Sequence, residues 1–192
     1  MMNLNNITNI GKYESESASE PEHLYDSYVN GGLKMRKHGF IICGFPGVGK
    51  TEAVKRYGER VHDSDSSKYA KFDGWEKGYC IDLISMALSG NYDYVLCSTH
   101  RKVVETMNQL FNDIPELKDD RFFIAMPGRD IPCEDWMKRF YHRNNDHIKN
   151  IDDFYAFLIS NWDDLVNQDY SMMNKAMMMY FGPDNYLSEY LY

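Results

Sequence analysis

The sequence has no long apolar run and no paired cysteines. No stretch approaches the roughly 18 to 20 consecutive apolar residues of a membrane helix, so we expect no membrane partner. Residues 1–20 are rich in Asn, Ser and Glu, lack an apolar signal core and predict a flexible polar lead-in. The four cysteines form no C-x-x-C pair, which argues against zinc and favours reduced, buried thiols at Cys43 and Cys97. These features together predict a cytoplasmic protein.

A surplus of positive charge is also missing. Lys and Arg number 21 against 29 Asp and Glu, which gives a formal net charge of −8. Binding to nucleic acid depends on clustered Lys and Arg that displace counterions, so this charge does not favour a polynucleotide partner, although basic residues gather over 129–143. The 192 residues are 43% hydrophobic and 15% aromatic, which is enough for one well-buried domain, expected over residues 21–192.

The most specific motif runs from Gly44 to Thr51. Its sequence, G-F-P-G-V-G-K-T, matches the phosphate-loop pattern G-x-x-x-x-G-K-[ST] at every fixed position, and it lies between an apolar run and a helical pattern. Glycines allow successive N–H groups to turn toward phosphate oxygens, and a helix start adds partial positive charge. We expect Lys50 to reach the β- and γ-phosphates of ATP and Thr51 to bind Mg²⁺. The expected nucleotide-binding residues are Gly44, Pro46, Gly47, Val48, Gly49, Lys50 and Thr51.

Short apolar runs alternate with helical patterns along the chain. This alternation predicts a parallel sheet of four to five strands covered by helices on both faces, a three-layer α/β/α sandwich. Strands are expected at 40–43, 61–63, 94–97 and 122–125, and helices at 23–29, 50–59, 75–88, 102–111, 134–143 and 151–167. The Met-rich residues 172–181 are predicted to form a last helix whose methionines pack against the sheet, with a partner-binding face as the alternative.

Polar residues follow the second and third expected strands. Because ligands of open α/β sheets bind beyond the carboxyl ends of the strands, these residues are candidates for the site. We expect Asp63 to face the metal through water and Asp65 to accept a proton from an attacking hydroxyl, with a solvated turn as the alternative. Ser98 and His100 are candidate substrate contacts, and His100 is alternatively a polar cap. No Walker B Asp follows the third strand, which shifts metal binding onto Thr51 and Asp63.

A basic segment follows the fourth expected strand. Arg139 and Arg143 are four residues apart, so on a helix they share one face. Two guanidinium groups on one face can hold a transferring phosphoryl group. We therefore predict a lid around residues 127–145 with Arg139 and Arg143 as catalytic residues and Arg129 as a substrate contact. A solvated basic helix paired with neighbouring carboxylates is the alternative interpretation.

The phosphate loop, the Asp63-Ser64-Asp65 run and the Arg139/Arg143 helix together resemble the nucleoside monophosphate kinase and shikimate kinase group of small P-loop kinases. The resemblance covers roughly residues 38–145. It implies an acceptor-binding segment after the second strand, an Arg-bearing lid that closes over ATP, and a D-x-D element with one Asp near the metal and the other on the acceptor hydroxyl. The chain is also similar to the compact nucleotide kinases of tailed bacteriophages, which implies the host cytoplasm. It departs from adenylate kinase in lacking a D-G-[FY]-P-R element after the third strand.

These features predict an ATP- and Mg²⁺-dependent P-loop kinase that moves the γ-phosphoryl group to a nucleotide-like acceptor, in the first place a (deoxy)nucleoside monophosphate. A hydroxyl on a nucleoside, a polynucleotide end or a modified base is an alternative acceptor, because Asp65 is available as a base. A non-catalytic regulatory NTP-binding module is a third reading, favoured by the missing Walker B acid and the Met-rich residues.

Overall fold

The computed structural model describes residues 38–71, 73–114, 117, 121–141 and 151–192. The predicted lead-in, the helix expected at 23–29 and Arg143 lie outside these residues. The main elements in chain order are β1 (Phe40–Gly44), α2 (Lys50–Tyr57), β2 (Val61–Asp63), α3 (Trp75–Leu88), β3 (Tyr94–Ser98), α4 (Arg101–Asp113), β4 (Phe122–Pro127), α5 (Cys133–Tyr141), α6 (Ile151–Val166) and β5 (Met177–Phe181). The described residues also form the short 3-10 helices η2 (Gly58–Arg60), η3 (Ser66–Lys68) and η6 (Leu187–Glu189).

The five described strands form one sheet in the order β2-β3-β1-β4-β5, and every pairing is parallel. The central strand β1 is apolar and almost wholly buried, as expected for a parallel strand covered on both faces. Its register places Cys43 opposite Cys97, with the two sulfur atoms 3.3 Å apart. Both thiols are free and buried, as predicted, and the hydrogen bond to Cys97 followed by burial raises the pKa of Cys43.

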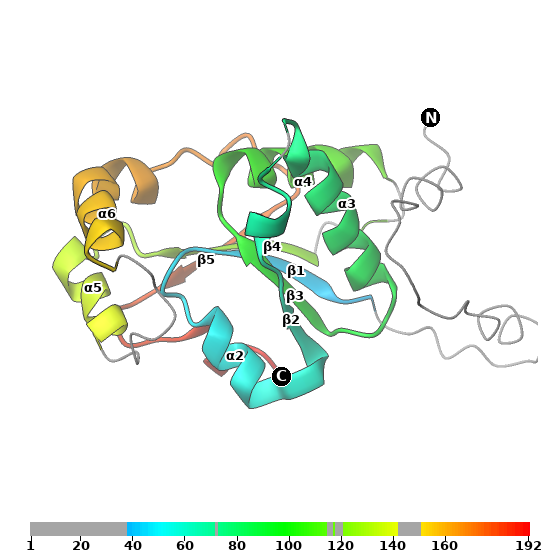
Figure 1. Ribbon diagram of the computed structural model, residues 1–192. Coiled ribbons are helices and arrows are strands. Elements are labelled where there is room, and N and C mark those ends of the chain that lie inside the picture. Colours follow the sequence, from blue (N-terminus) through cyan, green and yellow to red (C-terminus); the bar gives the residue numbers. More distant parts are fainter. Residues whose placement is uncertain (1–37, 72, 115–116, 118–120, 142–150) are drawn as a thin grey trace, which may run out of the picture.

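Helices lie on both sides of this sheet (Figure 1). In that view α2 lies below the strands, whereas α3 and α4 pack together above them. The chain therefore leaves β1 toward one face and leaves β3 toward the other, which is the arrangement that opens a crevice at the carboxyl ends of adjacent strands. The predicted α/β class with a parallel sheet is confirmed. No helix in the described part of the chain is long and apolar enough to cross a membrane.

The prediction of a final helix over 172–181 is wrong. Met177–Phe181 forms strand β5, which pairs in parallel with β4 from Phe123 opposite Met177 to Pro127 opposite Phe181. Methionine favours helices, but the edge of β4 offers a ladder of backbone partners, and tertiary pairing overrides the local propensity. Met178 and Met179 pack against the core as the prediction required, although from a strand.

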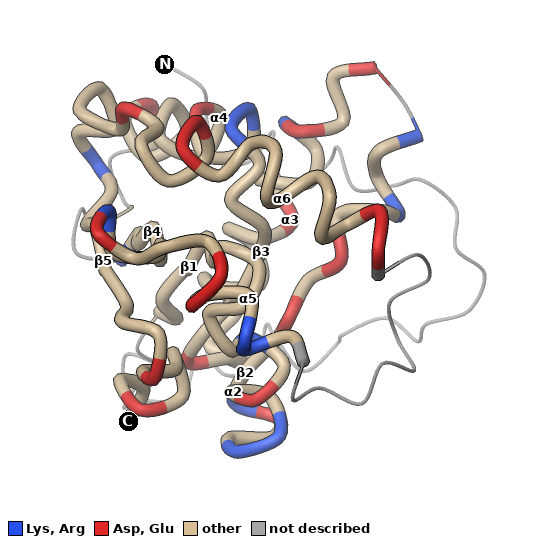
Figure 2. The backbone as a smooth tube through the Cα atoms, turned by 90° about the vertical axis from the view of Figure 1, so that its left-hand side faces the viewer, with Lys and Arg blue, Asp and Glu red and all other residues tan. Residues whose placement is uncertain are grey.

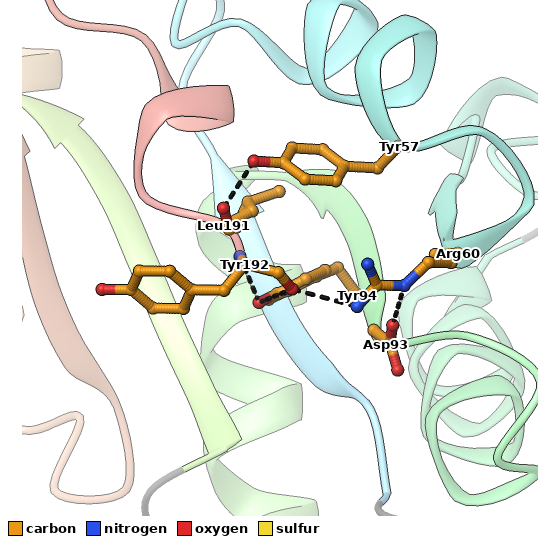
Figure 3. Close-up of polar contacts among 6 residues, drawn as sticks. All are labelled: Tyr57, Arg60, Asp93, Tyr94, Leu191 and Tyr192. Atoms are coloured by element: carbon orange, nitrogen blue, oxygen red, sulfur yellow. Dashed lines mark hydrogen bonds and ion pairs between the residues drawn. The ribbon is translucent and has the colours of Figure 1, made fainter.

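The segment 182–192 follows β5 and packs beside α2 (Figure 3). The Tyr57 hydroxyl donates hydrogen bonds to the carbonyl oxygens of Ser188 and Leu191. The backbone N–H of Tyr192 donates to the Tyr94 hydroxyl at 3.1 Å, and Arg60 donates to the Tyr192 carbonyl at 3.0 Å. The 182–192 segment is therefore attached to α2, the helix that begins at the end of the Gly44–Thr51 motif.

Candidate functional site

The residues 44–51, which we call the glycine loop, connect the carboxyl end of β1 to the start of α2. Gly47 and Gly49 have φ angles of 89° and 100°, in the region that L side chains rarely adopt. No side chain caps the start of α2. Among the described residues, no carbonyl accepts a hydrogen bond from the amides of Thr51 or Glu52. These unused amides and the positive end of the helix dipole make the loop suitable for an anion.

Lys50 belongs to the same loop and is the first residue of α2. Its ammonium donates a hydrogen bond of 2.6 Å to the carbonyl oxygen of Gly44, so the side chain folds back over the turn. The turn itself is closed by the Val48 amide, which donates to the Phe45 carbonyl at 3.2 Å. The Phe45 amide donates to Ala125 on β4 and ties the loop to the sheet. A cation and several amides are thereby held around one turn of backbone, and the exposed Thr51 stands next to them.

The carbonyl side of the glycine loop contacts α5 and the 182–192 segment. The indole N–H of Trp136 donates to the Pro46 carbonyl at 2.9 Å, and Arg139 donates to the Gly47 carbonyl at 3.0 Å. The backbone amide of Leu187 donates to the Val48 carbonyl at 2.8 Å. Three successive carbonyl groups of the loop therefore accept hydrogen bonds from donors outside it, and no local pattern of residues indicates these contacts.

Arg139, which we predicted to be a catalytic residue of a lid, lies among buried contacts in the structure. Its side chain is buried, with 4% of its surface exposed, and its guanidinium lies 3.9 Å from the Trp136 ring centre and 4.5 Å from that of Tyr186. It donates to the carbonyl groups of Gly47, Gly182, Pro183 and Asn185. The four-residue spacing of the arginines did not indicate that Arg139 is buried. Trp136 lies on the same face of α5 as Arg139, and this face packs against the glycine loop. The environment of Arg139 is that of a buried structural contact.

Ser98 lies directly beside the glycine loop. The register of β1 and β3 places Ser98 opposite Gly44. Its hydroxyl oxygen is buried, and within the described residues no group forms a hydrogen bond with it. Leaving a buried polar group unsatisfied costs about 1–3 kcal/mol. The structure thus brings this predicted substrate contact to the loop and leaves its hydroxyl available to a ligand.

The two predicted aspartates are farther from the loop. Asp63 is opposite Leu96, two residues before Ser98, and β2 is separated from β1 by β3, so it lies roughly 10 Å from β1 at ordinary strand spacing. The contact of Asp63 with a metal ion through water stays a prediction. The register of β2 with β3 ends at Asp63, so Asp65 lies two residues beyond the end of β2.

Asp65 also has a local structural role. Its carboxylate accepts hydrogen bonds from the amide and hydroxyl of Ser67 at 2.9 and 2.7 Å and caps η3. These bonds, the one from the hydroxyl first, lower the pKa of the Asp65 carboxyl below its usual value. The alternative interpretation as a turn therefore describes the observed contacts, while the carboxylate itself is exposed and ionised at neutral pH.

Aromatic side chains lie beyond the end of β3. The exposed ring of His100 is 5.8 Å from that of Trp75, and Trp75 in turn lies 5.7 Å from Tyr79. Tyr69 continues the row at 5.0 Å from Tyr79. We call Tyr69, Trp75, Tyr79 and His100 the aromatic row. The sequence places three of these residues between β2 and the middle of α3, but their separation gave no periodic signal that they would meet.

Arg129, which we predicted to be a substrate contact, is exposed in the turn after β4. Hydrogen bonds from Ser171, that from its backbone amide first, lower the pKa of the Asp169 carboxyl, and the positive charges of Arg101 and Arg129 add to this effect. Acidic and basic residues are interspersed along the described chain, with both signs present on α2 (Figure 2). In the described part of the chain, no three His, Cys, Asp or Glu side chains are grouped to hold a metal ion.

Comparisons with protein-family models, curated proteins and solved structures gave no match to this chain. Its function is therefore inferred from the residues of the site.

Proposed function

We propose that the chain is a P-loop phosphotransferase and that the glycine loop holds the β- and γ-phosphates of MgATP. One observation carries this proposal: a turn with two glycines at positive φ leads into an uncapped helix start, and the Lys50 ammonium lies at the same turn. Bound MgATP supplies the phosphoryl group and its leaving group. Amides, a cation and a hydroxyl at one point suit the charge of an oligophosphate.

Each of the proposed residues acts on that bound group in its own way. The Lys50 ammonium exchanges the Gly44 carbonyl for phosphate oxygens and neutralises charge there. The Thr51 hydroxyl is a suitable ligand for Mg²⁺, which in nucleotide sites keeps several waters and needs few protein ligands.

We propose a nucleotide, in the first place a (deoxy)nucleoside monophosphate, as the acceptor. This proposal is supported by Ser98, which lies opposite Gly44 of the glycine loop. Its hydroxyl is buried and forms no hydrogen bond within the described residues. The aromatic row offers the exposed ring of His100 and the half-buried ring of Trp75, on which a base can stack. The exposed Arg129 after β4 is available to an acceptor phosphate.

The direct test is binding of MgATP followed by a screen of acceptors. We expect calorimetry to detect heat from MgATP, and we expect γ-labelled ATP to transfer label to one or more nucleoside monophosphates. The screen also includes nucleosides and short oligonucleotides. No heat from either ATP or GTP would refute the proposal. Tight binding without transfer to any acceptor would instead favour the regulatory NTP-binding module.

A hydroxyl acceptor is the second candidate, because Asp65 lies two residues beyond the end of β2 and its lowered pKa keeps the carboxyl ionised. An Asp65→Asn variant separates the two, since an anionic phosphate acceptor needs no general base. We expect kcat/KM for a nucleoside monophosphate to change less than about threefold, whereas loss of a general base typically costs 10²–10⁴-fold.

Two features make this comparison clean. Asparagine caps helices about as well as aspartate, so the Asp65→Asn change should leave η3 intact. Ser67→Ala is the matched control, because it removes one hydrogen bond to Asp65 and keeps the carboxylate. A loss of activity in Asp65→Asn that Ser67→Ala does not share would establish the hydroxyl acceptor.

A further inference from the structure

The hydrogen bonds that the carbonyl groups of Pro46, Gly47 and Val48 accept also determine the direction of the amides in the same peptide groups. A trans peptide group is planar, with its N–H and C=O pointing in opposite directions, and no peptide bond in the described chain is cis. The Pro46 carbonyl belongs to the same peptide group as the Gly47 amide, and the Val48 carbonyl to the same group as the Gly49 amide. Holding these carbonyls with Trp136 and Leu187 therefore turns the two glycine amides toward the opposite side of the loop.

Arg139 joins the parts that supply these donors. Its guanidinium lies between the rings of Trp136 and Tyr186, and it donates both to the Gly47 carbonyl and to carbonyls of residues 182–185. A planar fork with five donors can satisfy several buried carbonyls at once, and stacking on two rings offsets part of the cost of burying the charge. The loop, α5 and the 182–192 segment consequently form one hydrogen-bonded unit.

The segment on the far side of Arg139 is itself fixed. Leu187 is buried, and residues 188–192 are held by hydrogen bonds to Tyr57, Arg60 and Tyr94 (Figure 3). Tyr57 lies on α2, the helix that the glycine loop begins. The 182–192 segment is thus held by Arg139 on one side and by Tyr57 of α2 on the other.

We infer that Trp136 and Arg139 are positioning residues: Trp136 orients the Gly47 amide of the glycine loop toward a bound oligophosphate, and Arg139 holds the loop to the 182–192 segment that supplies the other donor. This inference rests on the proposed function for the identity of the ligand. In this role α5 increases the affinity for the nucleotide by holding the carbonyl groups of the glycine loop. Neither side chain contacts the ligand in this role.

The decisive variant is Trp136→Phe, with Trp162→Phe as its matched control. Both tryptophans are buried and lie in one aromatic cluster, 6.4 Å apart, and each donates its indole N–H to a backbone carbonyl. Trp162 donates to Ile131 at 3.1 Å, outside the loop. Each substitution keeps an aromatic ring and removes one donor, so the expected stability losses are similar.

Two measurements on the full chain test the inference. The first is hydrogen exchange of the buried Val48 amide, which closes the turn by donating to Phe45. We expect it to exchange about tenfold faster in Trp136→Phe and at an unchanged rate in Trp162→Phe. The second is the Kd for MgATP, expected to rise about tenfold in Trp136→Phe only, since a typical net hydrogen bond is worth about a factor of ten.

Arg139→Lys gives a second, independent variant. Lysine keeps the charge but lacks the planar fork, so we expect a Kd raised by about thirtyfold or more, because several carbonyls lose their donors together. If this variant does not fold, Trp136→Phe still decides the question.

The outcomes separate this inference from the proposed function. An unchanged Val48 exchange rate in Trp136→Phe, or a Kd equal to that of Trp162→Phe, would overturn the inference while MgATP binding by the unmodified chain stands. If the unmodified chain binds neither MgATP nor inorganic pyrophosphate, the proposed function fails, and the exchange rates alone decide whether Trp136 orders the loop.

Discussion

A Lys50→Met variant is expected to lose phosphoryl transfer by about 10²–10³-fold or more, the cost of removing one well-placed charge donor at a transition state. Lys50 is the side chain whose ammonium lies at the turn of the glycine loop, where it donates to the Gly44 carbonyl. Methionine preserves the length of the aliphatic stem, so its packing over Gly44 is retained. The fold should therefore persist, and the Kd for MgATP should rise together with the fall in kcat.

Lys55→Met is the matched control for this prediction. Lys55 lies on the same helix, is 70% exposed and forms only a surface ion pair of 3.7 Å with Glu52 among its described contacts. Such pairs contribute about 0–1 kcal/mol, so transfer should change less than twofold. Steady-state kinetics and calorimetry on both variants provide the measurement. If Lys50→Met binds and turns over like the unmodified chain, the P-loop assignment is wrong; if Lys55→Met loses as much, the effect belongs to α2 as a whole.

Features that depend on neighbouring residues were predictable from the sequence. The apolar runs that became β1, β2, β3 and β4 are bounded by turn residues, and the structure extends them by at most two residues. The conformation of the glycine loop is local as well, because glycine is required where φ is positive, at Gly47 and Gly49.

Features that depend on distant contacts were not predictable. Arg139 and Gly47 are 92 residues apart, and the spacing of arginines on a helix is the same whether the face is buried or solvated. Residues 177–181 contain no polar residue that would reveal a period, so only the open edge of β4 selects a strand there. The contacts of Tyr57 with the 182–192 segment likewise bridge 131 residues or more. These parts of the site arise from tertiary packing, for which one sequence has no periodic signal.

Three glycine-to-alanine variants separate backbone strain from crowding in the proposed phosphate loop. Gly78 lies inside α3 with open space around it, so Gly78→Ala should stabilise the fold by about 0.5–1 kcal/mol. Gly74 has φ of 71° and also faces open space, so Gly74→Ala should cost only the strain of a left-handed residue, about 1–2 kcal/mol.

Gly47→Ala should have the largest effect, because both penalties apply at once. Its φ is 89°, and a Cβ atom would lie 2.9 Å from the indole nitrogen of Trp136 and 3.0 Å from Phe140. Overpacking of this kind costs about 1–3 kcal/mol, which with the backbone strain predicts a loss of about 2–5 kcal/mol. The methyl group would also push Trp136 from the Pro46 carbonyl, so the Kd for MgATP should rise by at least tenfold.

Urea unfolding and calorimetry on the three variants test this ranking. If Gly47→Ala unfolds with the same free energy change as Gly74→Ala, the contact between the loop and Trp136 does not constrain the backbone. If its stability falls as expected but MgATP binds unchanged, the glycine loop is a structural turn and the nucleotide site lies elsewhere. A combined loss of stability and affinity is the result that a phosphate-binding loop supported from α5 requires, because the same peptide groups would then serve both the fold and the ligand.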